Sequence, residues 1–287
     1  MIVTRFAPSP TGYLHLGHAF AAITAHDAAK AAANGRFLLR IEDLDSGRCR
    51  PEYEAAIYED LGWLGLSWET PVLCQSSRAG AYREALARLE AMGLTYPCFC
   101  TRKDIAEEIA RSIEAPHLTA LGPEGFLYPG TCRALPEDAR RKRMAREPYA
   151  LRLDVAKAVA LAGPLSFEEH GAGPNGERGI IPCDPTLFGD IVLARKQMPA
   201  AYHLAVVVDD AFQGVSLVTR GNDLFSATHV QRLLQALLGL PVPAYAHHRL
   251  VLDEQGKKFS KRDGAVTLRH LRETGVAPES IRRRLGL

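Results

Sequence analysis

Two histidines flank a glycine near the start of the chain, in the run His15-Leu16-Gly17-His18. The run follows an apolar stretch and a turn rich in proline and glycine, and it precedes an alanine-rich segment of helical character. In α/β sheets this junction of strand and helix binds phosphate, because backbone N–H groups point at it. His15 and His18 could stabilise phosphate oxygens in a transition state, and Gly17 would let a nucleotide approach the backbone. The same pattern is compatible with two histidines that only begin a helix.

A second run near the end of the chain, Lys258-Phe259-Ser260-Lys261-Arg262, carries three cations in a polar, glycine-containing segment. Such a loop could close over a triphosphate, with Lys258, Ser260 and Lys261 contacting the phosphates. Its charges would stabilise the pyrophosphate that leaves in an in-line displacement at the α-phosphorus, a reaction that needs no covalent step by the protein. The alternative for a run of this kind is a solvated lysine loop.

Three of the six cysteines are spaced for metal binding rather than for disulfides. Cys98 and Cys100 are too close in sequence for an ordinary structural disulfide, and Cys132 follows about thirty residues later. Three thiolates can form a tetrahedral zinc site if a fourth ligand is present. His117 is one candidate for that ligand, and three buried thiols without a metal are the other interpretation.

The bulk composition restricts the class of protein. The chain has 287 residues, of which 47% are hydrophobic, and a formal net charge of +2, so it can build a packed core and has no strong overall attraction for polyanions. It lacks a signal-peptide pattern and an apolar run of the roughly 18 residues that a membrane span needs. We therefore expect a cytoplasmic protein without a membrane partner. Two basic clusters, Arg140–Arg143 with Arg146 and Arg282–Arg284, are either solvated faces or nucleic-acid contacts.

The elements around these motifs follow an α/β pattern. A strand at Val3–Ala7, a helix from about Gly17 to Asn34 and a strand at Phe37–Ile41 form one βαβ unit, whose strands should be parallel. Further helices are expected at Pro51–Leu61, Ser77–Met92 and Ala227–Leu238, and further strands at Tyr149–Leu153, Ile191–Ala194, Leu204–Val208 and Val215–Thr219.

The chain divides into four parts on this pattern. Residues 1–95 and 149–240 carry the two halves of the α/β catalytic domain. Residues 96–148 contain cysteines, prolines and a basic run, and they interrupt the alternation of strands and helices. We interpret them as an insertion. Residues 241–287 hold the lysine loop and a short tail with room for one or two helices.

Taken together, the two phosphate-binding motifs resemble the two signature motifs of the class I aminoacyl-tRNA synthetases. The context resembles the glutamyl-tRNA synthetases within that class. The matching segments are Arg5–His18, Arg40-Ile41-Glu42-Asp43-Leu44-Asp45, Val207-Val208-Asp209-Asp210 and Arg220-Gly221-Asn222-Asp223-Leu224. The resemblance implies a Rossmann-type class I catalytic core that binds ATP, with Mg²⁺ arriving on the nucleotide. It also implies activation of glutamate to glutamyl-adenylate.

A substrate with two carboxylates calls for arginine, whose planar fork suits a carboxylate better than the point charge of lysine. By resemblance, the glutamate-binding positions are Arg5, Ser9, Glu42, Tyr202 and Arg220. Glu42 is expected to take the α-ammonium, and Ser9 and Tyr202 to form hydrogen bonds. Arg5 is favoured for the side-chain carboxylate, with Arg220 as the alternative. Four carboxylates, Asp43, Asp45, Asp209 and Asp210, are interpreted as structural or ribose-contacting rather than as a metal cage.

The resemblance also supplies a zinc pattern. In a truncated branch of the glutamyl synthetases, two cysteines one residue apart are followed by a tyrosine and, four residues later, a third cysteine. Cys98, Cys100, Tyr128 and Cys132 match that pattern, which implies one structural Zn²⁺ with Tyr128 as fourth ligand and His117 as the alternative. The loop between the halves of the pattern is longer here than in that branch.

That branch is the glutamyl-queuosine tRNA(Asp) synthetases, catalytic cores without an anticodon-binding domain, and the chain resembles them because only some 20 residues follow its lysine loop. The resemblance implies that glutamate is activated without tRNA and attached to the queuosine base in the anticodon loop of tRNA(Asp). It also implies a monomer. Two alternatives stay open: a compact glutamyl-tRNA synthetase that charges a tRNA 3′ end, and a non-catalytic paralogue that binds glutamate or ATP.

Overall fold

A parallel sheet of three strands forms the N-terminal part of the chain, in the order β1-β2-β3. The computed structural model describes residues 1–101, 103–107, 121–196, 198–252 and 266–287. The strands and their connecting helices are β1 (Val3–Phe6), α1 (Leu16–Lys30), β2 (Arg36–Ile41), α2 (Pro51–Trp63) and β3 (Glu69–Cys74). The parallel pairing of β1 with β2 confirms the predicted βαβ unit. Strand β3 was not predicted, because Pro71 within it is unusual for a strand; β3 lies at the edge of the sheet, where proline is tolerated.

A second sheet has the order β11-β12-β8-β9 and adjoins the first. Its elements are β8 (Ser166–Glu169), β9 (Gly179–Pro182), β11 (Leu217–Gly221), 3₁₀ helix η3 (Asn222–Leu224), α8 (Ala227–Leu237) and β12 (Ala244–His248). The backbone N–H of Ser216 donates to the carbonyl of Val3 at 3.0 Å, which places β1 beside β11. The chain leaves β1 toward β2 and leaves β11 toward β12, on opposite sides. In α/β sheets such a switch point is where ligands bind, outside the carboxyl ends of the strands.

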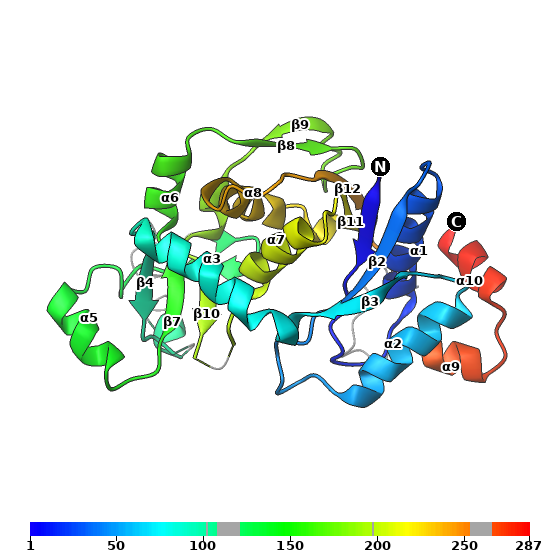
Figure 1. Ribbon diagram of the computed structural model, residues 1–287, viewed down its shortest axis with the longest axis horizontal. Coiled ribbons are helices and arrows are strands. Elements are labelled where there is room, and N and C mark those ends of the chain that lie inside the picture. Colours follow the sequence, from blue (N-terminus) through cyan, green and yellow to red (C-terminus); the bar gives the residue numbers. More distant parts are fainter. Residues whose placement is uncertain (102, 108–120, 197, 253–265) are drawn as a thin grey trace.

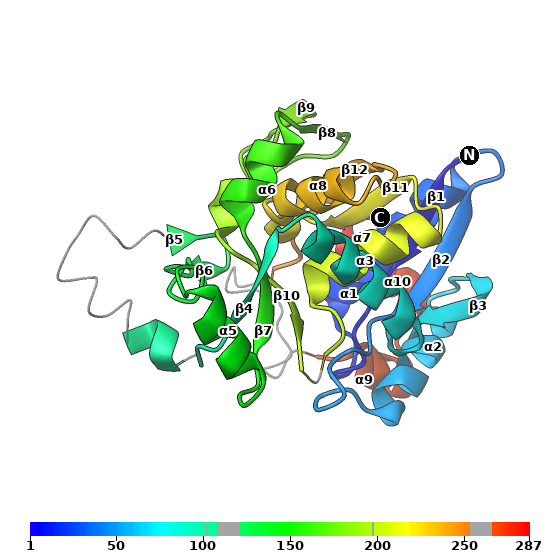
Figure 2. The same ribbon diagram turned by 60° about the vertical axis from the view of Figure 1, so that its left-hand side comes forward.

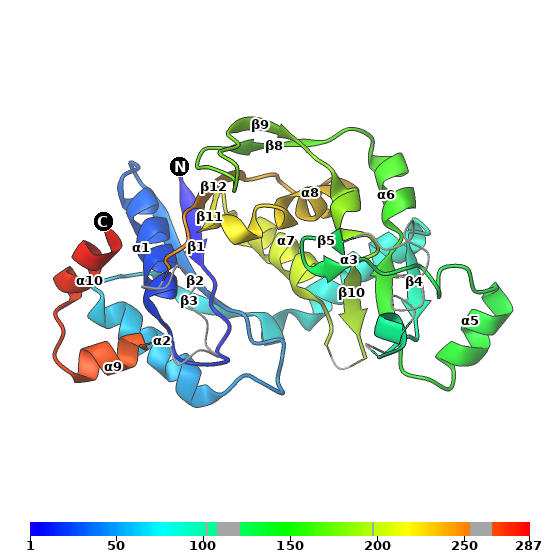
Figure 3. The ribbon, with the colours of Figure 1, turned by 180° about the vertical axis from the view of Figure 1, so that it is seen from behind.

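A small antiparallel sheet, in the order β10-β7-β4, forms the opposite end of the molecule from the C-terminal helices (Figures 1 and 3). Its elements and neighbours are β4 (Thr95–Cys98), β5 (Leu121–Gly122), β6 (Gly125–Phe126), α5 (Glu137–Met144), β7 (Ala150–Leu153), α6 (Val155–Ala162), η2 (Pro185–Phe188) and β10 (Val192–Arg195). Asp190 joins this sheet to the cysteine region, because its Oδ2 accepts from the Tyr96 hydroxyl at 2.5 Å and from Arg133 at 3.0 Å.

One predicted element is wrong. The run Leu204–Val208 was expected to be a strand but lies inside helix α7 (Tyr202–Phe212). Its valines favour strands, yet a short apolar run that is buried all round has no periodicity to separate strand from helix. Residues 203–207 are all buried, because α7 packs in the main core against α8 and against α3 (Ala79–Ala91), which follows η1 (Gln75–Arg78) (Figure 2). The helix thereby presents Asp209 and Asp210 to the sheet.

Two short helices form the tail, as predicted: α9 (Leu268–Glu273) and α10 (Pro278–Leu285). Their apolar side chains join the core that α1 and α2 share. Arg282 forms a bidentate ion pair with Asp27 of α1, at 2.8 and 3.1 Å, so this arginine of the second basic cluster is tied to the fold. None of the helices in the described part of the chain combines the length and apolar character required to cross a bilayer.

Candidate active site and metal centre

The two histidines of the first motif begin helix α1, and they do cap it. Nδ1 of His15 accepts from the backbone N–H of Gly17 at 3.1 Å, and Nδ1 of His18 accepts from the backbone N–H of His15 at 3.2 Å. Their ring centroids are 3.8 Å apart. A Cβ at Gly17 would lie 3.1 Å from the His15 ring, so only glycine leaves this arrangement undisturbed. With both Nδ1 atoms accepting, each neutral ring carries its proton on Nε2, which is the donor that a phosphate oxygen needs.

The C-terminal segment meets this motif directly. Thr267 forms a β-bridge with His15, and the backbone N–H of Leu268 donates to the carbonyl of Leu14 at 2.8 Å. Val266 and Thr267 are the first residues described after the lysine-loop segment. Lys258, Ser260 and Lys261, the predicted residues of the second motif, lie outside the described residues.

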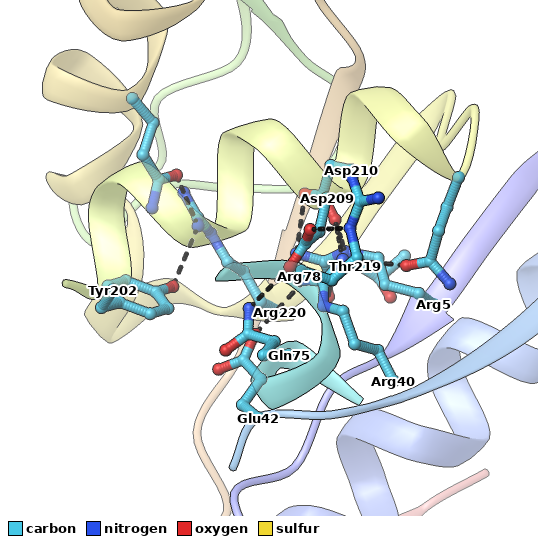
Figure 4. A network of polar contacts seen from close by, with 12 residues as sticks. Arg5, Arg40, Glu42, Gln75, Arg78, Tyr202, Asp209, Asp210, Thr219 and Arg220 are labelled. Carbon is cyan, nitrogen blue, oxygen red and sulfur yellow. Dashed lines mark hydrogen bonds and ion pairs between the residues drawn. The ribbon is translucent and has the colours of Figure 1, made fainter. Parts of the chain in front are cut away.

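A buried network of charges surrounds the carboxyl ends of β1 and β2 (Figure 4). Asp210 of α7 accepts from Nε of Arg5 at 3.0 Å and from Nη1 of Arg40 at 2.7 Å. Arg40 also contacts Glu42 at 3.3 Å. Burial raises the pKa of Glu42 despite its arginine neighbours, whereas Arg5 and Arg40 overcome burial and hold the pKa of Asp210 below its usual value. Asp210 therefore neutralises the charge of Arg5 within the protein.

The other three acidic residues also have partners within the fold, in agreement with a structural role. Asp209 is fully buried and accepts from the Tyr82 hydroxyl at 2.6 Å, from Gln75 at 3.0 Å and from Arg78 at 3.1 Å. Asp43 accepts from the backbone N–H of Ser76, and Asp45 pairs with Arg48. These contacts hold the segments that follow β2 and β3 against α7.

Arg220, at the carboxyl end of β11, has a different environment. It is 6% exposed, and its guanidinium donates to His247 at 3.0 Å, to Gln231 at 2.8 Å and to Thr228 at 2.7 Å, with the Tyr202 hydroxyl at 3.5 Å. All of these partners are neutral. Among the described residues, no carboxylate lies within ion-pair distance of Arg220, in contrast to Arg5.

The predicted glutamate-binding residues are brought together through this network. Arg5 donates from Nη1 to the carbonyl of Thr219 at 3.3 Å, which places it next to Arg220 on the neighbouring strand. Glu42 donates its backbone N–H to the carbonyl of Pro8 at 3.0 Å, so it adjoins the turn that contains Ser9. Tyr202 begins α7, with 36% of its surface exposed.

The three predicted thiols also gather. The Sγ atoms of Cys98, Cys100 and Cys132 lie within 4.8 Å of one another, with Cys100 and Cys132 at 3.5 Å. The Tyr128 hydroxyl lies 3.5 Å from the Cys100 sulfur and accepts from the backbone N–H of Cys132 at 2.9 Å. A tetrahedral zinc with Zn–S bonds of about 2.3 Å separates two sulfurs by about 3.8 Å, close to what is observed. His117, the alternative ligand, lies outside the described residues.

The electrostatics of this cluster favour a thiolate at Cys132 but oppose one at Cys100. The guanidinium of Arg152 lies 3.9 Å from the centre of the Tyr128 ring. Hydrogen bonds from Tyr128, from the backbone of Phe99 and from Cys100 outweigh burial and lower the pKa of Cys132, whereas burial raises the pKa of Cys100 to about 12. The type and spacing of the ligand atoms fit a zinc ion, which would replace the contacts among the thiols and stabilise the thiolate form.

The sequence analysis missed two residues, His247 and Glu169, that support the Arg220 side chain by hydrogen bonds. His247 lies on β12 and Glu169 on β8, 78 residues apart, and their side chains are fully buried against each other. Neither belongs to a recognisable local motif. The only local signal is that each residue is polar on the buried face of its strand, where the other buried residue is aromatic: Phe167 beside Glu169 and Tyr245 beside His247.

Two cavities lie between this site and the cysteine cluster. One of about 320 Å³ extends from Tyr202 to Tyr128 and includes Arg152 and Arg195. The other, of about 740 Å³, is lined by aromatic and basic residues that include Phe99, Tyr149, Arg152, Arg195 and Lys196. The first basic cluster has partners of its own on α5 and just after it. Arg141 and Arg143 pair with acidic residues of the same segment.

A family model described as "tRNA synthetases class I (E and Q), catalytic domain" matches residues 1–287. A Rhodobacter capsulatus protein named Glutamyl-Q tRNA(Asp) synthetase is 50% identical over an alignment that covers 100% of both chains. A Nocardia farcinica protein of the same name is 47% identical, over 96% of this chain and 81% of that protein.

Longer proteins are similar over part of their length. The Glutamate–tRNA ligase of Aquifex aeolicus is 40% identical over 98% of this chain and 55% of its own. The crystal structure of a glutamate-tRNA synthetase from Elizabethkingia anophelis superposes with a TM-score of 0.75 at 28% identity, covering 92% of this chain and 53% of that one. These findings confirm the predicted fold class and the enzyme type. The chain belongs to the class I tRNA synthetases for glutamate and glutamine, in the branch of the Glutamyl-Q tRNA(Asp) synthetases.

Proposed function

We propose that the protein activates L-glutamate with ATP to form glutamyl-adenylate without tRNA, and then transfers glutamate to the queuosine base of tRNA(Asp). The observation that carries the first step is Arg220, a buried arginine at the switch point of the sheet whose direct partners among the described residues are all neutral. An incoming carboxylate can therefore form the direct ion pair that no carboxylate of the described residues makes.

We propose Arg220, rather than Arg5, for the side-chain carboxylate of glutamate. Arg5 is already paired with Asp210 and shapes the site from the neighbouring strand. Glu42 is proposed to take the α-ammonium: burial raises its pKa, and a bound ammonium would stabilise its ionised form. Ser9 and Tyr202 are proposed to complete the pocket with hydrogen bonds.

The ATP site is proposed at the start of α1. His15, Gly17 and His18 would contact the phosphates there, since the helix N-terminus and two Nε2–H donors favour an anion. Lys258, Ser260 and Lys261 are proposed to act from the other side. The β-bridge between His15 and Thr267 supports this, because it anchors the segment after the lysine loop on the first motif. Mg²⁺ is proposed to arrive with ATP.

One structural zinc is proposed on Cys98, Cys100, Tyr128 and Cys132. Zinc in such a closed site contributes to folding and takes no part in the reaction. It would fix the start of the insertion to β4, whose last residue is Cys98. The cavities lined by aromatic and basic side chains between this centre and Tyr202 are proposed to accept the nucleotides of the tRNA loop, since stacking on aromatic rings and contact with arginine are how proteins bind unpaired bases.

The names of the relatives cited above support tRNA(Asp) as acceptor, and the similarity to the Aquifex aeolicus ligase favours a second candidate, charging of a tRNA 3′ end. The test uses pure protein with labelled glutamate, ATP and Mg²⁺. Bulk tRNA is taken from cells that make queuosine and from cells that do not. Label on queuosine-containing tRNA alone is the expected result, and prior removal of the 3′-terminal nucleotide should not prevent it. Equal label on both tRNA pools would establish 3′-end charging instead.

A further inference from the structure

His247 and Glu169 form a buried pair directly behind Arg220. Nδ1 of His247 lies 2.5 Å from Oε2 of Glu169, and both side chains are fully buried. The second carboxylate oxygen accepts from the backbone N–H groups of His247 and Gly171, each at 2.8 Å. On its other side, Nε2 of His247 receives the N–H of Nε of Arg220 at 3.0 Å. The three side chains therefore form a continuous chain of hydrogen bonds.

The donors and acceptors of these hydrogen bonds allow one protonation state of His247 and Glu169. An arginine N–H can only donate, so Nε2 of His247 must be a bare acceptor. Its proton then lies on Nδ1 and is donated to Glu169. Burial lowers the pKa of His247, in agreement with a neutral ring, and the hydrogen bonds from His247 outweigh burial and hold the pKa of Glu169 below its usual value. The carboxylate is thus ionised and the imidazole neutral.

We propose that Glu169 and His247 are positioning residues for glutamate recognition: they fix the orientation of the Arg220 guanidinium and balance its charge across the imidazole ring. The inference rests on the proposed role of Arg220 in binding the substrate carboxylate. Because the carboxylate of Glu169 lies on the far side of the His247 ring, no carboxylate of the described residues pairs with the outer edge of the guanidinium. That edge keeps its affinity for the carboxylate of the substrate, whereas a directly paired arginine such as Arg5 does not.

The hydrogen bonds run in one direction, from Arg220 to His247 and from His247 to Glu169, and this makes substitutions of Glu169 informative. In Glu169→Gln, one side-chain atom becomes an amide nitrogen. If it faces His247, it forces the ring to accept on Nδ1 and to place its proton on Nε2, against the N–H of Arg220. If it faces the other way, it opposes two backbone N–H donors. Glu169→Asp is a poorer fit in size but keeps the carboxylate. Glu168→Gln, on the exposed neighbouring residue of β8, is the matched control.

The experiment measures glutamate-dependent ATP–pyrophosphate exchange, with separate KM values for glutamate and ATP and a thermal melt of each variant. We expect Glu169→Gln to raise the KM for glutamate at least about tenfold at unchanged KM for ATP, Glu169→Asp to have a smaller effect, and Glu168→Gln none. An unchanged glutamate KM in folded Glu169→Gln, parallel changes in both KM values, or a larger defect in Glu169→Asp overturns the proposal. Absence of exchange in the unaltered protein would instead refute the proposed function.

A second measurement tests the tautomer of His247 in the unaltered protein. Nitrogen-15 NMR of the histidine-labelled protein at neutral pH should show the His247 ring, assigned by through-bond correlations, protonated on Nδ1 with a bare Nε2. A protonated Nε2 or a cationic ring at His247 overturns the proposed polarity.

Discussion

Replacement of Arg220 by glutamine tests the assignment of the substrate carboxylate most directly. The guanidinium is 6% exposed and its partners are neutral, so its charge is available to the ligand. A carboxylate bound by the guanidinium forms two charge-assisted hydrogen bonds, each worth about 1.5–3 kcal/mol. Taking only the lower value of each gives about 3 kcal/mol. At about 1.4 kcal/mol per factor of ten, kcat/KM for glutamate should fall by about 150-fold.

The assay is glutamate-dependent ATP–pyrophosphate exchange without tRNA. The KM for ATP should stay within about twofold, because Arg220 lies on β11 while the histidine motif begins α1. Arg220→Lys should be intermediate, since lysine keeps the charge but cannot hold His247, Gln231 and Thr228 at once. Arg232→Gln, on the same side of the fold but bonded to the carbonyl of Ser166, is the matched control.

Loss of protein stability has to be separated from loss of binding. Removing Arg220 leaves three buried acceptors without a donor, so a lower melting temperature is expected in Arg220→Gln. A folded Arg220→Gln variant with a glutamate KM within about threefold of the unaltered protein would refute the assignment. In that case Arg5, despite its pairing with Asp210, would be the arginine that binds the side chain.

Three further predictions follow from the site. Cys100→Ser should lower bound zinc from about one ion per chain to near zero, measured by elemental analysis of purified protein. Asp210→Asn should cost about 3–5 kcal/mol at pH 7, because it leaves the buried Arg5 without its carboxylate and Arg40 with Glu42 alone. The pKa of Asp210 is lowered in the folded protein, so its contribution is present above about pH 4 and is lost as the pH falls further; the difference in unfolding free energy between the two proteins should shrink there. His18→Ala should lower kcat of exchange about 100- to 1,000-fold with the glutamate KM retained.

Local patterns predicted the parts of the site that depend on neighbours in sequence. His15, Gly17 and His18 lie at the strand–helix junction where their spacing placed them. The cysteines also gather as predicted: Cys98 ends β4, Cys100 follows it two residues later, and Cys132 joins them from about thirty residues further along the chain. The histidine motif and the pair Cys98 and Cys100 are each set within a few residues.

Long-range pairing could not be predicted in the same way. The sequence favoured Arg5 for the substrate because nothing in its neighbourhood reveals Asp210, which lies 205 residues away. Asp210 reaches Arg5 only because residues 202–212 form a helix, and that segment was expected to contain a strand. The error in secondary structure and the uncertainty between the two arginines therefore have one cause, the continuous burial of residues 203–207 in α7.

Under the proposed function, the charge balance of the buried site would suit the amino-acid part of the adenylate better than free glutamate. Arg5, Arg40 and Arg220 face three carboxylates, those of Glu42, Glu169 and Asp210, so the described part of the site is neutral overall. Free glutamate would bring one ammonium and two carboxylates. In the adenylate the α-carboxylate has become a mixed anhydride. The amino-acid part then carries only two charges: the ammonium, which is proposed to pair with Glu42, and the side-chain carboxylate, which is proposed to pair with Arg220. The phosphate of the adenylate keeps one negative charge, which the histidine motif and the lysine loop are proposed to meet. A site of this kind would stabilise the transition state that leads to the adenylate.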